Sequence, residues 1–398
     1  MKKHEIPANF YQESLFLFEN RRLITRLDEI NVSINEVSHI FKMQEYAGDS
    51  AILKFAFQPK DGLVRINEKK GNVEETNVLF SFIACKNDLR KYIKFFNENG
   101  FLFPLSMGEF NEANSLEILE LSKRMSAAVE LMSQLSELEN KNYKRMLTLT
   151  LYLLLSKPII LESDSYAYKS CSFEQIFRIF DNGFMQNTVN GLPLDNDYNF
   201  VIRDTIFGET KMHIDIYRHT DENRDDELDA FWHKVFHSYC NYRFGEHNII
   251  NKKIIDVLYH TYFNIGQIAK CTYEKIIFVD GVKEDWSCFN DSFKKTLVEV
   301  AKVIVGLEIN SNLNGIKPEY DIDIMEPRWK VSDLLSAMYF SIFYMRPNIE
   351  LTRKCENPNC NNYFTVSRTS SRKKFCCQEC ANAVAQARFR AKKKAPIL

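Results

Sequence analysis

Five cysteines crowd into one short segment of the chain and give the sequence its clearest chemical signal. Cys355 and Cys360 form one close pair, and Cys376, Cys377 and Cys380 follow after a basic loop. Zn²⁺ prefers four thiolate or imidazole ligands arranged as a tetrahedron, and two cysteine pairs separated by a loop supply such a set. The pattern therefore predicts one structural Zn²⁺.

The spacing leaves one ligand open. Cys380 belongs to the second pair in either case, and its partner is Cys376 or Cys377. We favour Cys376, because it directly follows an aromatic residue at the expected end of a short strand. Its spacing of four residues from Cys380 also suits a ligand pair at the start of a helix. A segment so poor in large apolar residues is not expected to fold without the metal.

The order of residues around these cysteines is similar to a known zinc finger. The segment reads Cys-x4-Cys-x-x-Tyr-Phe, then an Arg/Lys-rich loop, then Phe-Cys-x3-Cys-Ala-Asn and a helix rich in Ala and Arg. It resembles the treble-clef finger of the CGNR type, found at the C-terminus of bacterial proteins associated with transcription. Asn382 matches the asparagine of that motif, whereas Ala381 and Ala383 stand where the family has Gly and Arg. The resemblance covers this segment only, and it implies a treble-clef-like fold.

Charge is distributed unevenly along the chain. Between Arg353 and Lys394 eleven Lys or Arg residues face two acidic ones, a net charge of +9. Because the whole chain carries −1, the remainder carries −10. A basic segment attached to an acidic body is typical of proteins that bind nucleic acid. The residues expected to contact phosphates are Arg372, Lys373, Lys374, Arg388, Arg390, Lys392 and Lys393.

The expected C-terminal helix suits contact with a nucleic-acid backbone. Alanines recur from Ala381 to Ala391, and their small side chains allow a close approach while the neighbouring cations reach phosphates. DNA is expected ahead of RNA, although the charges alone do not distinguish the two. Three alternatives remain: a solvated helix, a tail that docks on the acidic stretch 221–229, and a finger that binds a protein partner.

The rest of the chain predicts an α+β body that is mostly helical and carries small antiparallel hairpins. Strands are expected at 51–57 and 63–66, joined by a turn at Asp61-Gly62, with a third strand at 77–84 and a hairpin over 198–219. A helix capped by Asn87 or Asp88 should end at Gly100. Further helices are expected at 20–45, 113–137, 140–156, 227–243, 251–270, 290–307 and 332–344.

These elements suggest a division into a body over 1–347 and a finger over 348–398. The body divides in turn into two subdomains, about 1–160 and 161–347. The apolar periodicity of the body does not continue through 348–352, which therefore reads as a joint.

The body offers weaker chemical signals. His233 and His237 are four residues apart on an expected helix, with Asp229 one turn earlier. Arg243 and His247 are similar to the Arg-x4–6-His motif of HEPN-type ribonucleases, but only three residues separate them. The sequence has no phosphate-binding glycine loop and no Gly-x-Ser-x-Gly. We therefore expect no enzyme, with a nuclease or other effector of phage defence as the rival hypothesis.

The leading hypothesis is a cytoplasmic bacterial DNA-binding regulator whose body senses a ligand or forms a homo-oligomer. The first residues lack the apolar stretch of a signal peptide, and the longest apolar run, 146–155, is too short to cross a membrane. The five cysteines outside the cluster are scattered singly, as reduced core thiols are.

Overall fold

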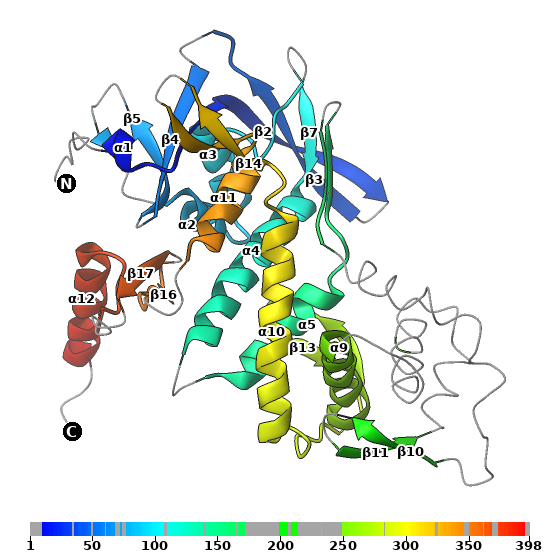
Figure 1. The fold of residues 1–398 in the computed structure, drawn as a ribbon. Helices are drawn as coiled ribbons and strands as arrows, with labels where there is room; N and C mark the ends of the chain where they lie inside the picture. Colours follow the sequence, from blue (N-terminus) through cyan, green and yellow to red (C-terminus); the bar gives the residue numbers. More distant parts are fainter. Residues whose placement is uncertain are drawn as a thin grey trace. The chain divides into compact units, whose positions relative to one another are not determined.

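A computed structural model gives the fold of the chain (Figure 1). It describes residues 10–33, 36–48, 51–59, 61–67, 72–73, 77–106, 110–137, 141–163, 166–171, 199–205, 208–213, 232, 249–281, 283–322, 325–345, 350–360, 362–367 and 373–394. Helices alternate with small antiparallel sheets, so the predicted α+β class is confirmed.

Two compact units make up the chain. Unit 1 comprises Met1–Ser136, Pro158–Ser170 and Glu308–Leu398, and unit 2 comprises Glu137–Lys157 and Cys171–Leu307. The C-terminal segment with the cysteines thus groups with unit 1. The boundaries expected from the sequence, at about 160 and at 347, stay predictions.

A four-stranded antiparallel sheet with the order β1-β4-β5-β6 begins unit 1 (Figure 1). The predicted hairpin is confirmed, because β4 and β5 pair through the turn before Gly62, whose φ of +74° favours glycine. The elements here are α1 (Phe10–Glu13), β1 (Phe16–Arg21), β4 (Ile52–Gln58), β5 (Gly62–Asn67) and β6 (Asn72–Val73).

The helix predicted over 20–45 is wrong. This stretch forms the strands β2 (Leu23–Ser33) and β3 (Glu36–Glu45), which pair antiparallel, and β7 (Asn111–Asn114) pairs with β3. Burial alternates along β2 and β3, as at Thr25 and its partner Met43, both of which are buried. This period of two distinguishes a half-buried strand from a helix, and the many charged residues in the stretch obscured it.

The third strand predicted over 77–84 is also wrong, because these residues form the helix α2 (Val78–Ile83). Asn77 caps the helix, and its Oδ1 accepts a hydrogen bond from the N–H of Leu79 at 2.9 Å. Nearly every side chain of α2 is buried. A short, wholly apolar run has no periodicity that separates a buried strand from a buried helix.

The helix predicted to end at Gly100 is confirmed as α3 (Leu89–Asn99). Asp88 is its N-cap and accepts a hydrogen bond from the N–H of Arg90 at 3.1 Å. Gly100 has a φ of +80°, and a Cβ at this position would lie 2.6 Å from the carbonyl oxygen of Arg21. Only glycine fits both conditions.

An aromatic core joins strands and helices of unit 1. The rings of Phe57 and Phe340 lie 4.9 Å apart, and those of Phe41 and Phe96 lie 5.5 Å apart. The helices predicted over 113–137 and 332–344 are confirmed as α4 and α11. The remaining elements of unit 1 are α4 (Ser115–Ser136), β8 (Ile160–Ser163), β9 (Tyr166–Lys169), β14 (Ile316–Asp321), β15 (Glu326–Val331), α11 (Leu334–Phe343), β16 (Glu350–Lys354), β17 (Tyr363–Ser367) and α12 (Gln378–Lys394).

Unit 2 is built largely from helices. The helices predicted over 140–156 and 290–307 are confirmed as α5 and α10, and the hairpin predicted around Gly208 is confirmed as β10 and β11. The helix predicted over 251–270 ends early, because a π-helical turn, η4, leads into the strand β12. The elements are α5 (Tyr143–Leu155), β10 (Asn199–Thr205), β11 (Gly208–His213), α9 (Ile249–Tyr259), η4 (His260–Ile265), β12 (Ile268–Cys271), β13 (Ile276–Phe278) and α10 (Asp291–Ser311), whose last residues belong to unit 1.

Several expectations for the body fall outside the described residues. These are the helix over 227–243, apart from the helical residue Trp232, and the candidate side chains Asp229, His233, His237, Arg243 and His247. Within the described part of the chain, no helix is long and apolar enough to cross a membrane.

Candidate metal centre

The cysteine cluster is positioned by one hairpin and one helix. Strands β16 and β17 pair antiparallel, with Lys354 opposite Tyr363. Cys355 directly follows β16, and Cys360 lies in the loop that leads to β17. Cys376 precedes α12, and Cys380 lies in its first turn. The hairpin therefore holds the first cysteine pair, the start of α12 holds the second, and the two pairs lie beside each other.

Hydrogen bonds of the backbone shape the loop that holds the first pair. The N–H of Cys355 donates to the carbonyl oxygen of Asn362, and the N–H of Cys360 donates to that of Asn357, both at 2.9 Å. The side chain of Asn357 is buried, and its Oδ1 accepts from the N–H of Asn359 at 3.1 Å. These bonds fix the direction in which both cysteine side chains leave the loop.

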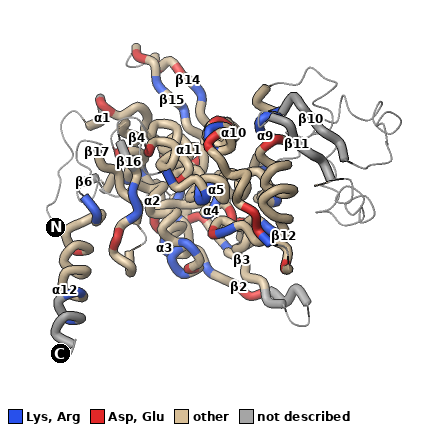
Figure 2. Tube along the Cα trace, turned by 90° about the horizontal axis from the view of Figure 1, so that it is seen from below, with Lys and Arg blue, Asp and Glu red and all other residues tan. Residues whose placement is uncertain are grey.

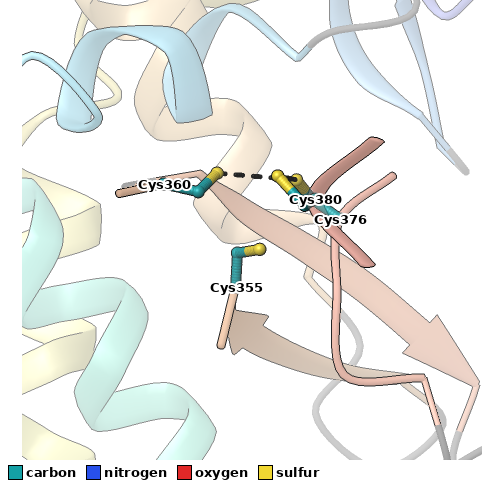
Figure 3. A group of neighbouring side chains, drawn as sticks. All are labelled: Cys355, Cys360, Cys376 and Cys380. Carbon is teal, nitrogen blue, oxygen red and sulfur yellow. Dashed lines mark hydrogen bonds between the residues drawn. The ribbon is translucent and has the colours of Figure 1, made fainter. Parts of the chain in front are cut away.

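The four sulfurs lie close together. The Sγ atoms of Cys355, Cys360, Cys376 and Cys380 are all within 4.8 Å of one another, and the side chains point toward a common centre (Figure 3). The Sγ of Cys376 is 3.6 Å from that of Cys360 and 3.7 Å from that of Cys380. Four sulfurs placed about 2.3 Å from a tetrahedral Zn²⁺ would be about 3.8 Å apart. The cluster therefore fits an ion of this size.

The electrostatics of the cluster favour a cation at its centre. Burial and the neighbouring thiols of Cys360 and Cys380 raise the pKa of Cys376 well above its ordinary value. Burial also opposes ionisation of Cys355, but backbone hydrogen bonds from Cys376 and Asn357, together with the thiols of Cys376 and Cys360, outweigh it and lower the pKa of this thiol. A divalent cation stabilises all four thiolates at once, which the protein groups alone do not.

Cys377 is placed differently from Cys376. Its side chain is exposed, and its Sγ lies 3.8 Å from the Sγ of Cys376 but outside the group of four. The short strand expected before Cys376 is wrong, because residues 373–377 contain no strand. The N–H of Glu356 instead donates to the carbonyl oxygen of Lys374 at 3.0 Å, which holds this segment beside the first cysteine pair.

A small apolar core supports the cluster. Cys355, Phe364 and Val366 are buried together, and Phe375 packs against them. The Nζ of Lys373 lies 5.4 Å from the centre of the Phe364 ring. So few apolar groups give little stability by themselves, as expected of a segment that depends on a metal.

The residues expected to contact phosphates are only partly described. Lys373 and Lys374 are exposed beside the second cysteine pair, and Lys374 forms an ion pair with Glu356 at 3.4 Å. Arg388 and Arg390 are exposed on α12, whose basic residues appear in Figure 2. Arg372 lies outside the described residues. Lys392 and Lys393 belong to α12, but their side chains are not described.

The roles of Asn357 and Glu356 were not anticipated from the sequence. For Asn357 a local signal exists. It begins an Asn-Pro-Asn stretch between two cysteines, and such a stretch predicts a turn because Asn side chains form hydrogen bonds with nearby backbone groups. The contact between Glu356 and Lys374 joins residues on either side of β17 and has no such local signal.

Comparisons of the chain with protein-family models, with curated proteins and with solved structures gave no match. The site is therefore defined by its own geometry: a four-cysteine cluster near the C-terminus, consistent with a zinc finger.

Proposed function

We propose that Cys355, Cys360, Cys376 and Cys380 bind one structural Zn²⁺ and that the resulting finger binds nucleic acid through its basic surface. The observation that carries this proposal is that the four sulfurs lie within 4.8 Å of one another at the start of an exposed basic helix. Two of their separations, 3.6 and 3.7 Å, are close to the distance between ligands in a zinc–thiolate tetrahedron. The metal holds the helix start against the hairpin, and the helix carries the charges.

Exposure along α12 supports a contact with the DNA backbone. Ala383, Ala385 and Ala387 are exposed with Arg388 and Arg390, so the small side chains leave the cations accessible. The major groove of B-DNA admits an α-helix, whereas the deep, narrow major groove of duplex RNA does not. We therefore favour DNA. The regulatory role is part of the same proposal and comes from the resemblance to CGNR-type fingers.

Fluorescence anisotropy with a labelled DNA duplex tests the proposal. The variant changes Arg388, Arg390, Lys392 and Lys393 to Gln, which keeps helix propensity nearly intact. Each lost phosphate contact should reduce the slope of log affinity against log salt by about 0.9. Four lost contacts should therefore flatten the slope by about 3.6. Changing Lys373 and Lys374 to Gln should act in the same direction.

The matched control removes charge elsewhere. Lys91→Gln with Lys94→Gln takes two exposed cations from α3 and should leave the salt slope unchanged. Zinc content must be equal in all variants, so that a loss of binding reports charge. Equal affinity of wild type and the helix variant, or no binding by wild type at low salt, would refute nucleic-acid binding and favour a protein partner for the finger.

A further inference from the structure

A cavity of about 280 Å³ lies in unit 1, where the end of β1 meets the segment after α3 and the start of α11. The apolar part of its lining consists of Phe18, Ile52, Phe103 and Leu105. Phe18, Phe103 and Leu105 are buried, whereas Ile52 is 38% exposed. The volume is near the lower limit of small-molecule sites, about 300 Å³. The cavity therefore suits a small ligand that has an apolar part.

Hydrogen bonds of Asn20, which also lines the cavity, hold this wall in place. The Nδ2 of Asn20 donates to the carbonyl oxygens of Asn99 and Phe101, both at 2.9 Å. Its Oδ1 accepts from the N–H of Arg21 at 2.9 Å. These bonds tie β1 to the segment that leads to Phe103, so the cavity is shaped before a ligand binds. Such preorganisation favours binding, because no ordering of the site remains to oppose it.

Four charged side chains line the same cavity: Glu19, Arg21, Glu45 and Asp333. Two of them already interact with other groups of the fold. Asp333 is the N-cap of α11, and its Oδ1 accepts from the N–H of Ser336 at 2.7 Å. Glu19 is exposed and stands opposite Lys54 in the register of β1 and β4. Arg21 and Glu45 are therefore the charges through which the cavity can recognise a ligand.

Arg21 and Glu45 interact with each other and leave binding groups unused. The Nε of Arg21 lies 3.5 Å from Oε2 of Glu45, and among the described residues the Nη atoms of Arg21 have no partner. These atoms form the planar fork that matches a carboxylate. Burial raises the pKa of Glu45, although Arg21 and the N–H of Leu105 act in the opposite direction. Because its charge is incompletely compensated, an ammonium group beside Glu45 is stabilised.

The three features together match an α-amino acid with an apolar side chain. Such a molecule carries an ammonium and a carboxylate on one carbon atom, so its two charges lie close together, as those of Arg21 and Glu45 do. An ammonium against Glu45 and a carboxylate against Arg21 give four charges that alternate in sign. The apolar side chain then covers the wall of Phe18 and Phe103. A simple anion or cation satisfies one member of the pair and is repelled by the other.

We propose that this cavity binds a free α-amino acid with an apolar side chain. Arg21 and Glu45 select the zwitterion, and the wall of Phe18 and Phe103 selects the apolar side chain. None of the residues that line the cavity belongs to the finger. The test of this site is therefore independent of zinc and of nucleic acid.

Isothermal titration calorimetry of the full chain with L-phenylalanine and with L-leucine measures the binding. Two analogues of L-phenylalanine each lack one charge: phenethylamine has no carboxylate, and 3-phenylpropionate has no ammonium group. Each should bind at least about tenfold more weakly than L-phenylalanine, because it forgoes the hydrogen bonds to one charged side chain. No binding of either amino acid at millimolar concentration, or equal affinity for L-phenylalanine and both analogues, would overturn the proposal.

Two substitutions test the separate roles of the charges. Glu45→Gln should weaken the binding of L-phenylalanine at least about tenfold and strengthen that of 3-phenylpropionate, because Arg21 is released. Arg21→Gln should weaken the binding of L-phenylalanine similarly and strengthen that of phenethylamine.

The matched control is Glu112→Gln, which removes a carboxylate that pairs with Lys42 at 3.2 Å and does not line the cavity. It should leave all affinities unchanged. The analogues are compared within each variant, so a loss of stability alone cannot produce opposite preferences in the two variants. An equal loss of affinity for the amino acid and both analogues would show that Arg21 and Glu45 do not contact the ligand.

Discussion

Arg124 and Glu308 form an ion pair that is closed to water, although 184 positions separate them in the sequence. Their side chains are 1% and 2% exposed. The Nε of Arg124 donates to Oε1 of Glu308 at 3.2 Å, the second bond joins Nη2 to Oε2, and the Tyr339 hydroxyl donates to Oε1 at 2.8 Å. This network links α4, the end of α10 and α11 within unit 1.

Removing the carboxylate of this pair should strongly destabilise the folded protein. Glu308→Gln leaves the Arg124 guanidinium buried without its counter-charge, which should cost about 3–5 kcal/mol of unfolding free energy. Replacing both residues, as Arg124→Met with Glu308→Leu, should recover most of that loss because no charge then remains buried. Urea denaturation followed by circular dichroism measures both differences.

The control for this change is an exposed pair on α3. Glu98→Gln removes the partner of Lys94, whose side chain is 74% exposed, and should cost less than about 0.5 kcal/mol. A similar small cost for Glu308→Gln would mean that water reaches the Arg124 side chain.

Local signals in the sequence were sufficient for some elements of the fold. Asp88 and Gly100 mark both ends of α3, and each acts through its own side chain or backbone conformation. The helix α2 and the strands β2 and β3 were assigned wrongly, because an apolar run or a charged stretch is compatible with either structure until its packing partners are known. The partnership of Arg124 with Glu308 has no local signal at all.

The same distinction applies to the metal centre. The cysteine spacing was enough to predict the cluster, because ligands close in sequence approach each other with few turns between them. Which of Cys376 and Cys377 joins the group of four also depends on how the segment before α12 meets the β16–β17 hairpin, where the N–H of Glu356 donates to the carbonyl oxygen of Lys374. That contact is set by tertiary structure and could not be derived from spacing.

Single substitutions of the cysteines should identify the metal ligands. Cys355→Ser, Cys360→Ser, Cys376→Ser and Cys380→Ser should each release Zn²⁺, since structural sites need all four ligands. Cys377→Ser should retain one Zn²⁺ per chain, because this exposed thiol lies outside the group of four. Elemental analysis of freshly purified protein measures the stoichiometry. Wild-type protein without zinc, or full retention in Cys360→Ser, would contradict the zinc site.

His260 should make unit 2 sensitive to acid. Burial lowers the pKa of this side chain from 6.5 to about 4, so the native state holds a neutral imidazole. Its stabilising effect is complete above pH 6.5 and is lost as the pH falls toward 4, because only the unfolded state then binds the proton readily. Between pH 7 and pH 5 the loss should be about 2 kcal/mol.

Denaturant unfolding at several pH values measures this contribution. His260→Gln cannot take up the proton and should lose about 2 kcal/mol less than wild type over that range. The control is Leu116→Ser, which changes an exposed side chain that cannot bind a proton and should leave the pH dependence as in wild type. Parallel pH profiles for wild type and His260→Gln would show that His260 titrates normally in the native state.

The finger is expected to fold separately from the remainder of unit 1. Contacts between them include the rings of Tyr363 and Phe80, which lie 6.3 Å apart, and the Ser133 hydroxyl, which donates to the carbonyl oxygen of Thr352 at 2.9 Å. The hydroxyl of Thr352 also lies 3.9 Å from the sulfur of Met345. The finger has its own small core of Cys355, Phe364 and Val366. Truncation after Pro347 should therefore lower the midpoint of thermal unfolding by less than about 5 °C.

Differential scanning calorimetry of the truncated chain checks this expectation, and a full-length variant supplies a second measurement. Cys355→Ser should unfold the finger by releasing its metal, while the main transition stays near its wild-type temperature. If the main transition has the same temperature in the truncated chain and in this variant, the domain boundary lies near 347, because both changes remove the folded finger and leave the rest intact. If both proteins aggregate or lose the main transition, Tyr363 and its neighbours belong to the core of unit 1, and the finger and body fold as one cooperative unit.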